Sequence, residues 1–262
     1  MINQHQPRKR FGQHFLHDQA TIERILAAIN AQPGQRIIEI GPGKGELTIP
    51  LLQCVGEMDV VELDRDLVNY LSTCCQETGT LRIHSEDALK FDFGRFPVGL
   101  RVVGNLPYNI STPLLFHLLE YADHIEDMLF MLQREVVERI CSDPGSRRYG
   151  RLSVMLQYHF ETDQLFTIGP DAFSPPPRVE SAMIRLRPWS EPRYRQTDMK
   201  VFSQIVKAAF AQRRKTLRNA LKGIVSPSQL QEIGIAPSSR AEILPIEAYV
   251  SLANLVCNNK NQ

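Results

Sequence analysis

The chain has 262 residues, of which 43% are hydrophobic and 23% charged, and its formal net charge is +1. The length and composition are those of an ordinary globular protein with one large domain, or one large domain and a small additional one. The net charge near zero excludes an overall positive electrostatic field that would attract nucleic acid. Because the chain has no run of about 18 apolar residues, no apolar core in its basic N-terminus and no Cys-x-x-Cys, we expect a soluble cytoplasmic protein with reduced thiols, no membrane partner and no metal site.

Short apolar runs alternate with longer segments of helical spacing between residue 20 and about residue 140. Helices are predicted at 21–29, 46–53, 65–75, 111–122 and 134–140, and strands at 36–41, 58–64, 81–87, 100–106 and 127–133. Strands that alternate with helices form βαβ units, and such units predict a parallel sheet whose central strands are apolar on both faces. The first half of the chain therefore has the pattern of an α/β fold.

The pattern changes after residue 150. Residues 151–168 and 181–188 are strand-like with no long helix between them, which predicts an antiparallel pair at the edge of the sheet. A charged, Pro-rich stretch at 188–198 is predicted to be a linker, and the chain from 200 to 223 is predicted to be helical throughout. The expected domains are an α/β domain with a basic N-terminal arm (1–190) and a small all-helical domain (191–262).

A glycine-rich loop follows the first predicted strand. Gly41, Gly43 and Gly45 stand directly before a predicted helix, where glycines let the backbone turn sharply and approach a ligand closely. The usual dinucleotide pattern is G-x-G-x-x-G, but here the third glycine comes one position early, and the carboxylate of Glu39 would repel a diphosphate. We therefore expect Gly41 and Gly43 to bind a cofactor that has a cationic centre and an amino-acid end.

Two further acids stand where the next strands end. Glu62 ends the second strand, where its carboxylate can accept both hydroxyls of a ribose, and Asp87 ends the third, in reach of an adenine amine. For each acid alone, a helix cap or a solvated turn is the better explanation. Together with Glu39 they occupy the carboxyl ends of three successive strands, where ligands of open α/β sheets bind. This combination predicts S-adenosylmethionine as the cofactor, in preference to NAD.

The fourth predicted strand leads into the tetrapeptide Asn105-Leu106-Pro107-Tyr108. An exocyclic amine is a poor nucleophile because its lone pair is delocalised, and two acceptors that hold its N–H groups would orient it toward a methyl group. The Asn105 side-chain oxygen and the Leu106 carbonyl can be those acceptors, Pro107 fixes the backbone, and Tyr108 offers a face for stacking. The alternative is a turn that ends a strand and carries a core tyrosine.

Seven separated segments resemble the KsgA family of small-subunit rRNA adenine dimethyltransferases, which are relatives of the Erm methyltransferases of large-subunit rRNA. The segments are 8–18, 39–48, 60–67, 86–89, 104–111, 173–186 and 209–221. The resemblance implies a Rossmann-like methyltransferase sheet, mostly parallel with an antiparallel edge strand, and a helical C-terminal domain. It also implies that two adjacent adenosines, in a hairpin loop near the 3′ end of 16S rRNA, each receive two methyl groups.

The resemblance also assigns residues. Carried over by position, the family's cofactor contacts fall at His14, Leu16, Gly41, Glu62, Asp87 and Asn105. Many members have Asn where this chain has His14, so a side-chain contact would have an altered reach, whereas a backbone contact would be unchanged. Phe173 matches the aromatic residue that the family places opposite the tetrapeptide's tyrosine, although without the resemblance it would be interpreted as a core residue.

Basic residues cluster in the C-terminal third. Residues 200–222 contain seven Lys or Arg and no acid, and Arg213, Arg214 and Lys215 are consecutive. A basic helix is often only a solvated face, but beside a base-modifying site we interpret it as a contact to RNA phosphates. Arg147 and Arg148 form a second predicted contact together with Arg151, and residues 8–10 form a third.

The sequence thus leads to one preferred hypothesis and two alternatives. The preferred function is S-adenosylmethionine-dependent dimethylation of 16S rRNA by a monomer, within a pre-30S particle late in small-subunit assembly. One alternative is an Erm-like methyltransferase of large-subunit rRNA, which would share the glycine loop and the tetrapeptide. The other is a non-catalytic assembly or transcription factor that retains the fold, against which the intact glycine loop, acids and tetrapeptide argue.

Overall fold

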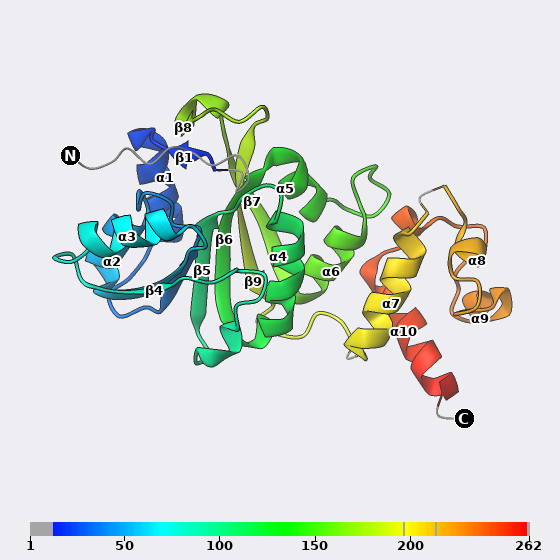
Figure 1. Ribbon diagram of the computed structural model, residues 1–262. Coiled ribbons are helices and arrows are strands. Elements are labelled where there is room, and N and C mark those ends of the chain that lie inside the picture. Colours follow the sequence, from blue (N-terminus) through cyan, green and yellow to red (C-terminus); the bar gives the residue numbers. More distant parts are fainter. Residues whose placement is uncertain (1–12, 196, 213, 261–262) are drawn as a thin grey trace. The chain divides into compact units, whose positions relative to one another are not determined.

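The computed structural model describes residues 13–195, 197–212 and 214–260 (Figure 1). The chain divides into two compact units. The first unit consists of Met1–Val137 and Asp163–Pro188, and the second of Glu138–Thr162 and Trp189–Gln262. The predicted division at residue 190 stays a prediction; in the structure, the second unit also includes residues 138–162.

A seven-stranded sheet has the strand order β4-β3-β2-β5-β6-β9-β7. Its strands are β2 (Ile37–Ile40), β3 (Glu57–Val61), β4 (Thr80–His84), β5 (Leu100–Asn105), β6 (Ile125–Gln133), β7 (Phe160–Ile168) and β9 (Ser181–Pro188). The pairs β2–β3, β2–β5, β3–β4 and β5–β6 are parallel, whereas β6–β9 is antiparallel. The predicted α/β fold, with a mostly parallel sheet and an antiparallel strand toward one edge, is confirmed.

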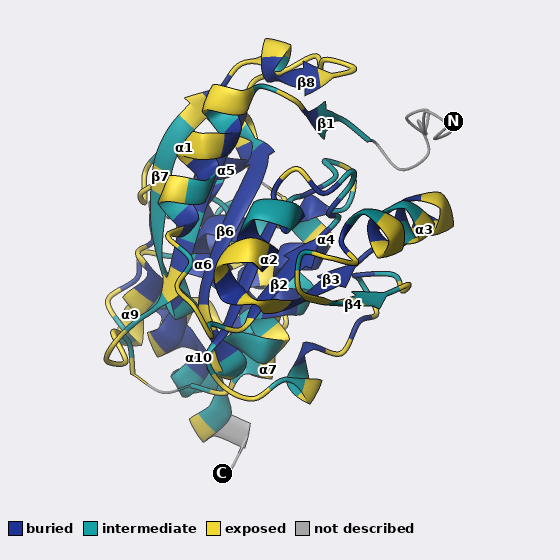
Figure 2. Cartoon of the chain, turned by 90° about the vertical axis from the view of Figure 1, so that its left-hand side faces the viewer, coloured by how far each residue is buried: buried dark blue, intermediate teal, exposed yellow. Residues whose placement is uncertain are grey.

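Helices cover the sheet because its central strands are apolar on both faces. They are α1 (Gln19–Ile29), α2 (Thr48–Val55), α3 (Arg65–Cys74), α4 (Ser111–Leu118) and α5 (Arg134–Ile140). Every residue of β2 is buried, and α1, α2 and α3 each have a buried and an exposed side, as Figure 2 shows. The buried side of α1 consists of Ile22, Ile25 and Ile29. Asp18 begins α1 by accepting a hydrogen bond from the amide of Thr21, and Asp64 begins α3 by accepting one from the amide of Asp66.

The prediction of a strand throughout 151–168 was wrong in its first half. Residues Arg151–His159 form helix α6, and strand β7 begins only at Phe160. The hydroxyl of Ser153 accepts a hydrogen bond from the Gly150 amide and donates one to the Arg139 carbonyl, which fixes the start of the helix. Because α6 is buried from Leu152 to Leu156, its residues are apolar except for Ser153, and such a short buried run does not distinguish a helix from a strand.

The prediction that residues 200–223 are helical throughout was also wrong. In the second unit, α7 (Met199–Phe210) ends before α8 (Leu217–Ala220) begins, and α9 (Pro227–Glu232) and α10 (Ile246–Lys260) follow. The amides of Leu217 and Arg218 donate to the carbonyls of Ser239 and Pro237, so this backbone bonds to a distant segment instead of continuing the helix. No helix in the described ranges is long and apolar enough to span a membrane.

The topology brings several chain segments to one edge of the sheet in the first unit. Since β2, β3, β4 and β5 are parallel, their carboxyl ends meet there. Strand β9 runs antiparallel to β6, so its first residue, Ser181, pairs with the last residue of β6, Gln133, at the same edge. A second, two-stranded sheet pairs β1 (Phe15–Leu16) with β8 (Phe173–Ser174) (Figure 1). The segment 13–16, which is called the N-terminal segment below, thereby lies beside residues 173–174, which precede β9.

Candidate active site

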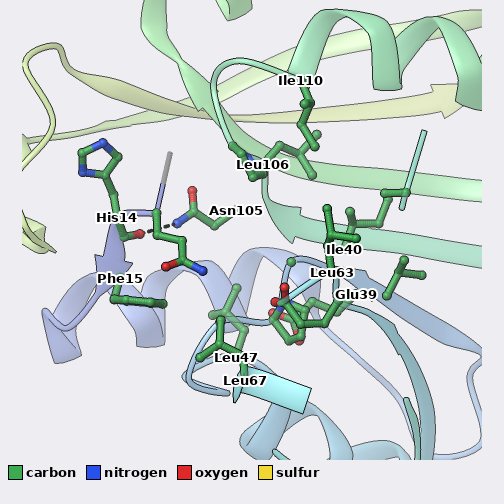
Figure 3. A pocket seen from close by; sticks show the side chains of 18 of the residues that line it. His14, Phe15, Glu39, Ile40, Leu47, Leu63, Leu67, Asn105, Leu106 and Ile110 are labelled. Carbon is green, nitrogen blue, oxygen red and sulfur yellow. Dashed lines mark hydrogen bonds between the residues drawn. The ribbon is translucent and has the colours of Figure 1, made fainter. Parts of the chain in front are cut away.

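A cavity of about 340 Å³ lies in the first unit, where the parallel strands end (Figure 3). It is lined by residues from five stretches of the chain, 13–16, 39–47, 61–67, 86–89 and 105–110. All seven residues predicted to bind the cofactor line it, namely His14, Leu16, Gly41, Gly43, Glu62, Asp87 and Asn105. Of the residues predicted for catalysis, Leu106, Pro107 and Tyr108 also line the cavity. The structure therefore brings the predicted cofactor residues and the tetrapeptide together.

The glycine loop lies against the N-terminal segment. Gly43 has a φ of +59°, in the left-handed region that side chains rarely adopt, and a Cβ added there would lie 3.2 Å from Cδ1 of Phe15. The ammonium of Lys44 lies 4.9 Å from the centre of the same ring. The backbone conformation thus favours glycine at position 43, and a side chain there would also crowd Phe15, which packs directly on the loop.

Backbone amides hold the carboxylates at the ends of β3 and β4. The Glu62 carboxylate accepts a hydrogen bond of 2.8 Å from the Asp64 amide, and the Asp87 carboxylate accepts one of 3.0 Å from the Leu89 amide. Burial raises the pKa of Glu62 above its ordinary value, and backbone hydrogen bonds oppose this rise. Asp87 therefore caps a turn and lines the cavity, so the two interpretations of this acid from the sequence are compatible.

Glu39 is the most deeply buried carboxyl group in the lining. It is 2% exposed, and its carboxylate accepts a hydrogen bond of 2.6 Å from the Thr48 hydroxyl. Burial raises the pKa of Glu39 to about 7, the Thr48 hydrogen bond opposes the rise, and the negative charge of Glu62 adds to it. A cation in the cavity would stabilise both ionised carboxylates, whereas a diphosphate would be repelled by them. The lining thus suits a cationic ligand.

The tetrapeptide is anchored to the strands on both sides of it. A Cβ added at Gly104 would lie 2.4 Å from the carbonyl oxygen of Ile40, so β5 approaches β2 more closely than any side chain allows. The Leu106 amide donates to the Met131 carbonyl of β6 at 3.2 Å, and the Ile110 amide donates to the Pro107 carbonyl at 3.1 Å. The backbone that carries Asn105 and Tyr108 is therefore held on each side.

The amide of Asn105 has a defined orientation. Its Nδ2 donates a 3.1 Å hydrogen bond to the main-chain carbonyl of His14, as the dashed line in Figure 3 shows. Because a carbonyl oxygen only accepts, the amide nitrogen must face His14 and the side-chain oxygen Oδ1 points away from it. Asn105 therefore presents an acceptor on the side opposite the N-terminal segment.

His14, which replaces the Asn of many family members, makes contacts through both its backbone and its side chain. Its Nδ1 lies 2.7 Å from the carbonyl oxygen of Pro175, so Nδ1 carries a hydrogen and donates it. Its ring stacks on the ring of Tyr108 with 5.8 Å between centroids and 26° between planes. Its carbonyl accepts from Asn105. These contacts tie the N-terminal segment to the tetrapeptide and to the segment after β8, and a direct contact to the cofactor stays a prediction.

Tyr108 and Phe173 differ in their surroundings. The Tyr108 hydroxyl lies 2.7 Å from the hydroxyl of Ser181, a residue that the sequence argument did not single out. Phe173 is 2% exposed, pairs with Leu16 across the small sheet and belongs to the hydrophobic core. For Phe173 to face a base, its ring would have to leave this packing, so its predicted role stays a prediction. No pattern in the sequence marks Ser181, because a buried hydroxyl is recognised only by its partner.

The predicted RNA-contacting residues lie in the second unit where they are described. Arg147, Arg148, Arg214 and Lys215 are exposed. Arg148 also forms an ion pair with Glu138 at 3.1 Å. Because α7 ends at Phe210, Arg214 and Lys215 lie between helices and not on the predicted basic helix. Arg213 and residues 8–10 lie outside the described residues.

Comparisons with known proteins agree with this geometry. Residues 4–258 match the family described as "Ribosomal RNA adenine dimethylase". Among curated relatives named "Ribosomal RNA small subunit methyltransferase A", the Hydrogenovibrio crunogenus protein is 50% identical over 262 residues, covering 98% of each chain. The Pseudomonas aeruginosa protein with that name is 53% identical over 256 residues, covering 97% of this chain and 96% of the relative.

Two solved structures resemble nearly the whole chain. The 23S rRNA methyltransferase ErmE has a TM-score of 0.72 and 25% identity, and the match covers 93% of this chain and 99% of that one. A dimethyladenosine transferase from Plasmodium falciparum has a TM-score of 0.79 and 22% identity, with 95% and 98% coverage, and shows the shared fold. The cationic cofactor that the buried carboxylates favour is S-adenosylmethionine. The chain belongs to the ribosomal RNA adenine dimethylase family of S-adenosylmethionine-dependent methyltransferases.

Proposed function

We propose that this enzyme dimethylates the exocyclic amines of two adjacent adenosines in a hairpin loop near the 3′ end of 16S rRNA. It acts as a monomer in the cytoplasm, on a pre-30S particle late in small-subunit assembly. The observation that carries the proposal is the meeting of three carboxylates and the tetrapeptide 105–108 in one cavity. The identity of about half the residues with proteins named for the small subunit supports the choice of substrate.

The cavity lining offers a partner for each part of the cofactor. S-adenosylmethionine supplies an electrophilic methyl group on a positively charged sulfur. Glu62 would accept the ribose hydroxyls and Asp87 the adenine amine, since these carboxylates follow β3 and β4 and both line the cavity. The Gly41–Gly43 turn, the segment 14–16 and Asn105 would enclose the rest. These side chains bind and orient the cofactor, and they take no proton from it.

The tetrapeptide orients the attacking amine. Asn105 Oδ1 points away from His14, so it can accept one N–H of an adenine amine, and the Leu106 carbonyl can accept the other. Pro107 holds the backbone between them. Both acceptors favour a pyramidal nitrogen whose lone pair faces the methyl group. The nitrogen becomes acidic only after it has been methylated, so positioning and charge placement provide the catalysis and no strong base is required.

RNA binding is proposed to combine base capture with phosphate contacts. A target adenine has to leave its stack, which costs a few kcal/mol and least in a loop, and the face of Tyr108 recovers about 1–3 kcal/mol by stacking. The exposed basic residues Arg147, Arg148, Arg214 and Lys215 are proposed to contact phosphates. Arg148 would exchange its ion pair with Glu138 for a phosphate.

Incubation with labelled S-adenosylmethionine and ribosomal particles tests this function. We expect label in unmethylated 30S particles, recovered as dimethyladenosine from two adjacent positions, and none in particles that are already methylated. Label in 50S particles alone would identify the Erm-like alternative, for which the similarity to ErmE is the supporting observation. Particle binding without any label would identify a non-catalytic factor.

A further inference from the structure

Ser181 is a buried polar residue in the first unit to which the proposed chemistry gives no role. It is the first residue of β9 and is 0% exposed. Because β9 is antiparallel to β6, Ser181 lies opposite Gln133, at the edge of the sheet where the tetrapeptide also lies. Its hydroxyl oxygen lies 2.7 Å from the hydroxyl oxygen of Tyr108. Strand direction thus places this hydroxyl at the site without placing it in the cavity lining.

The hydrogen bond between Ser181 and Tyr108 holds the hydroxyl end of the Tyr108 ring, and the backbone at the other end of this side chain is also held. The Pro107 carbonyl accepts hydrogen bonds of 3.1 Å from the amides of both Ile110 and Ser111, which fixes the backbone beside Tyr108. The Ser111 hydroxyl donates to the Tyr108 carbonyl at 3.2 Å. A tyrosine held only at its backbone can still turn about its two side-chain torsions. A partner for the hydroxyl at the opposite end of the ring restricts both torsions.

One face of the Tyr108 ring has a neighbour as well. The His14 ring stacks there, and His14 is itself held by the hydrogen bond from its Nδ1 to the Pro175 carbonyl. The centroid distance of 5.8 Å is shorter than the roughly 7 Å needed to insert a flat base between two rings at ordinary contact distances. The ring of Tyr108 is therefore held in one plane by Ser181 at its hydroxyl and by the His14 ring on one face.

We propose that Ser181 is a positioning residue for methyl transfer, whose buried hydroxyl holds Tyr108 in the plane on which the target adenine stacks. That plane decides where the amine of the stacked base lies relative to Asn105. A ring that can turn still binds the base, but it presents the amine at varied angles. The inference rests on the proposed function, because it requires that Tyr108 stacks on the target.

The expected effect of Ser181→Ala is a loss of rate and not of binding. Removing one neutral hydrogen bond at this position should lower the single-turnover rate roughly tenfold at saturating RNA and cofactor. The affinity for S-adenosylmethionine should stay at the wild-type value, since Ser181 does not line the cavity. Ser181→Thr, which keeps a hydroxyl and suits a strand, should restore most of the rate. Ser153→Ala is the matched control, because Ser153 is equally buried and its hydroxyl bonds to Arg139 in the second unit.

A double-mutant cycle tests whether Ser181 acts through the tyrosine hydroxyl. Tyr108→Phe should lower the single-turnover rate by the same factor as Ser181→Ala. The double variant should be no slower than either single variant. A wild-type rate in Tyr108→Phe, or additive losses, would overturn the proposal even if Ser181→Ala failed to fold. A parallel fall in cofactor affinity for Ser181→Ala would indicate general disruption and would overturn it too.

Tyr108→Ala separates a failure of this inference from a failure of the proposed function. If Tyr108→Ala is impaired in capturing RNA bases but Ser181→Ala reacts at the wild-type rate, only the positioning role is lost. If Tyr108→Ala itself methylates 30S particles at the wild-type rate, stacking on Tyr108 is wrong, and the proposed mechanism fails with it.

Discussion

Replacing Glu39 by glutamine tests the electrostatics of the cavity in the protein without its cofactor. The side chain keeps its size and an oxygen that can accept from Thr48, and it loses only the ability to ionise. Burial raises the pKa of Glu39 from 4.5 to about 7 in the folded protein. Since one unit of pKa corresponds to about 1.4 kcal/mol, ionising Glu39 costs the folded state roughly 3 kcal/mol.

The sign of the pH dependence follows from the direction of the shift. Below pH 4.5 the carboxyl group is protonated in both states and adds nothing, whereas between pH 4.5 and about 7 only the folded state retains the proton. The stability of the wild type relative to Glu39→Gln is therefore lost as pH rises through 7. Most of this change lies between pH 5 and pH 8. Over that range the free energy of unfolding of the variant should rise by roughly 2–3 kcal/mol relative to that of the wild type.

Urea unfolding of both proteins at pH 5 and pH 8 measures this difference directly. Glu232→Gln, at an exposed position on α9, is the control. Its free energy of unfolding should differ from that of the wild type by the same amount at both pH values. If the difference in unfolding free energy between Glu39→Gln and the wild type is the same at pH 5 and pH 8, Glu39 ionises in the folded protein as easily as in water. Glu39 would then give the cavity no preference for a cation.

Two further predictions concern binding. Glu62→Ala should weaken cofactor binding by about 1.5–3 kcal/mol, the range for a charged hydrogen bond, and leave RNA affinity unchanged; an unaltered affinity by calorimetry, in a folded variant, would remove Glu62 from the site. Replacing Arg214 and Lys215 by glutamine should flatten the salt dependence of RNA binding by up to about 0.7–0.9 for each lost phosphate contact. Cofactor binding should be unaffected, and an unchanged salt slope would mean that these residues are only a solvated surface.

That the predicted cofactor residues lie together in one cavity could be foreseen from the sequence, because it depends on a simple rule. Parallel strands bring their carboxyl ends to one edge, so the residues that end or follow those strands must meet there. Glu62, Asp87 and Asn105 all follow this rule, and all of them line the cavity. The assignment needed only the strands, which apolar runs reveal, and no knowledge of how the side chains pack.

The contacts between distant segments could not be predicted in this way. His14 and Pro175 are separated by 161 positions, and Tyr108 and Ser181 by 73, so no local pattern connects either pair. A tyrosine in the sequence indicates a face for stacking, whereas the buried partner of the Tyr108 hydroxyl, Ser181, becomes visible only in the structure. The same limit explains why one continuous helix was predicted for 200–223, since α7 ends at Phe210 and the amide of Leu217, where α8 begins, bonds to the distant carbonyl of Ser239.

The single-turnover rate of Asn105→Ala tests the central claim most directly, which is that the tetrapeptide orients the target amine for methyl transfer. The change removes Oδ1 as an acceptor and the hydrogen bond to the His14 carbonyl, and leaves the Leu106 carbonyl and the Tyr108 ring in place. At saturating cofactor and 30S particles, the rate should fall by at least about 10²-fold, the scale for losing one well-aimed polar group at a reacting centre. RNA affinity should hardly change, since phosphate contacts dominate it. A rate near that of the wild type would show that the amine is oriented by other groups, and it would contradict this account of the active site.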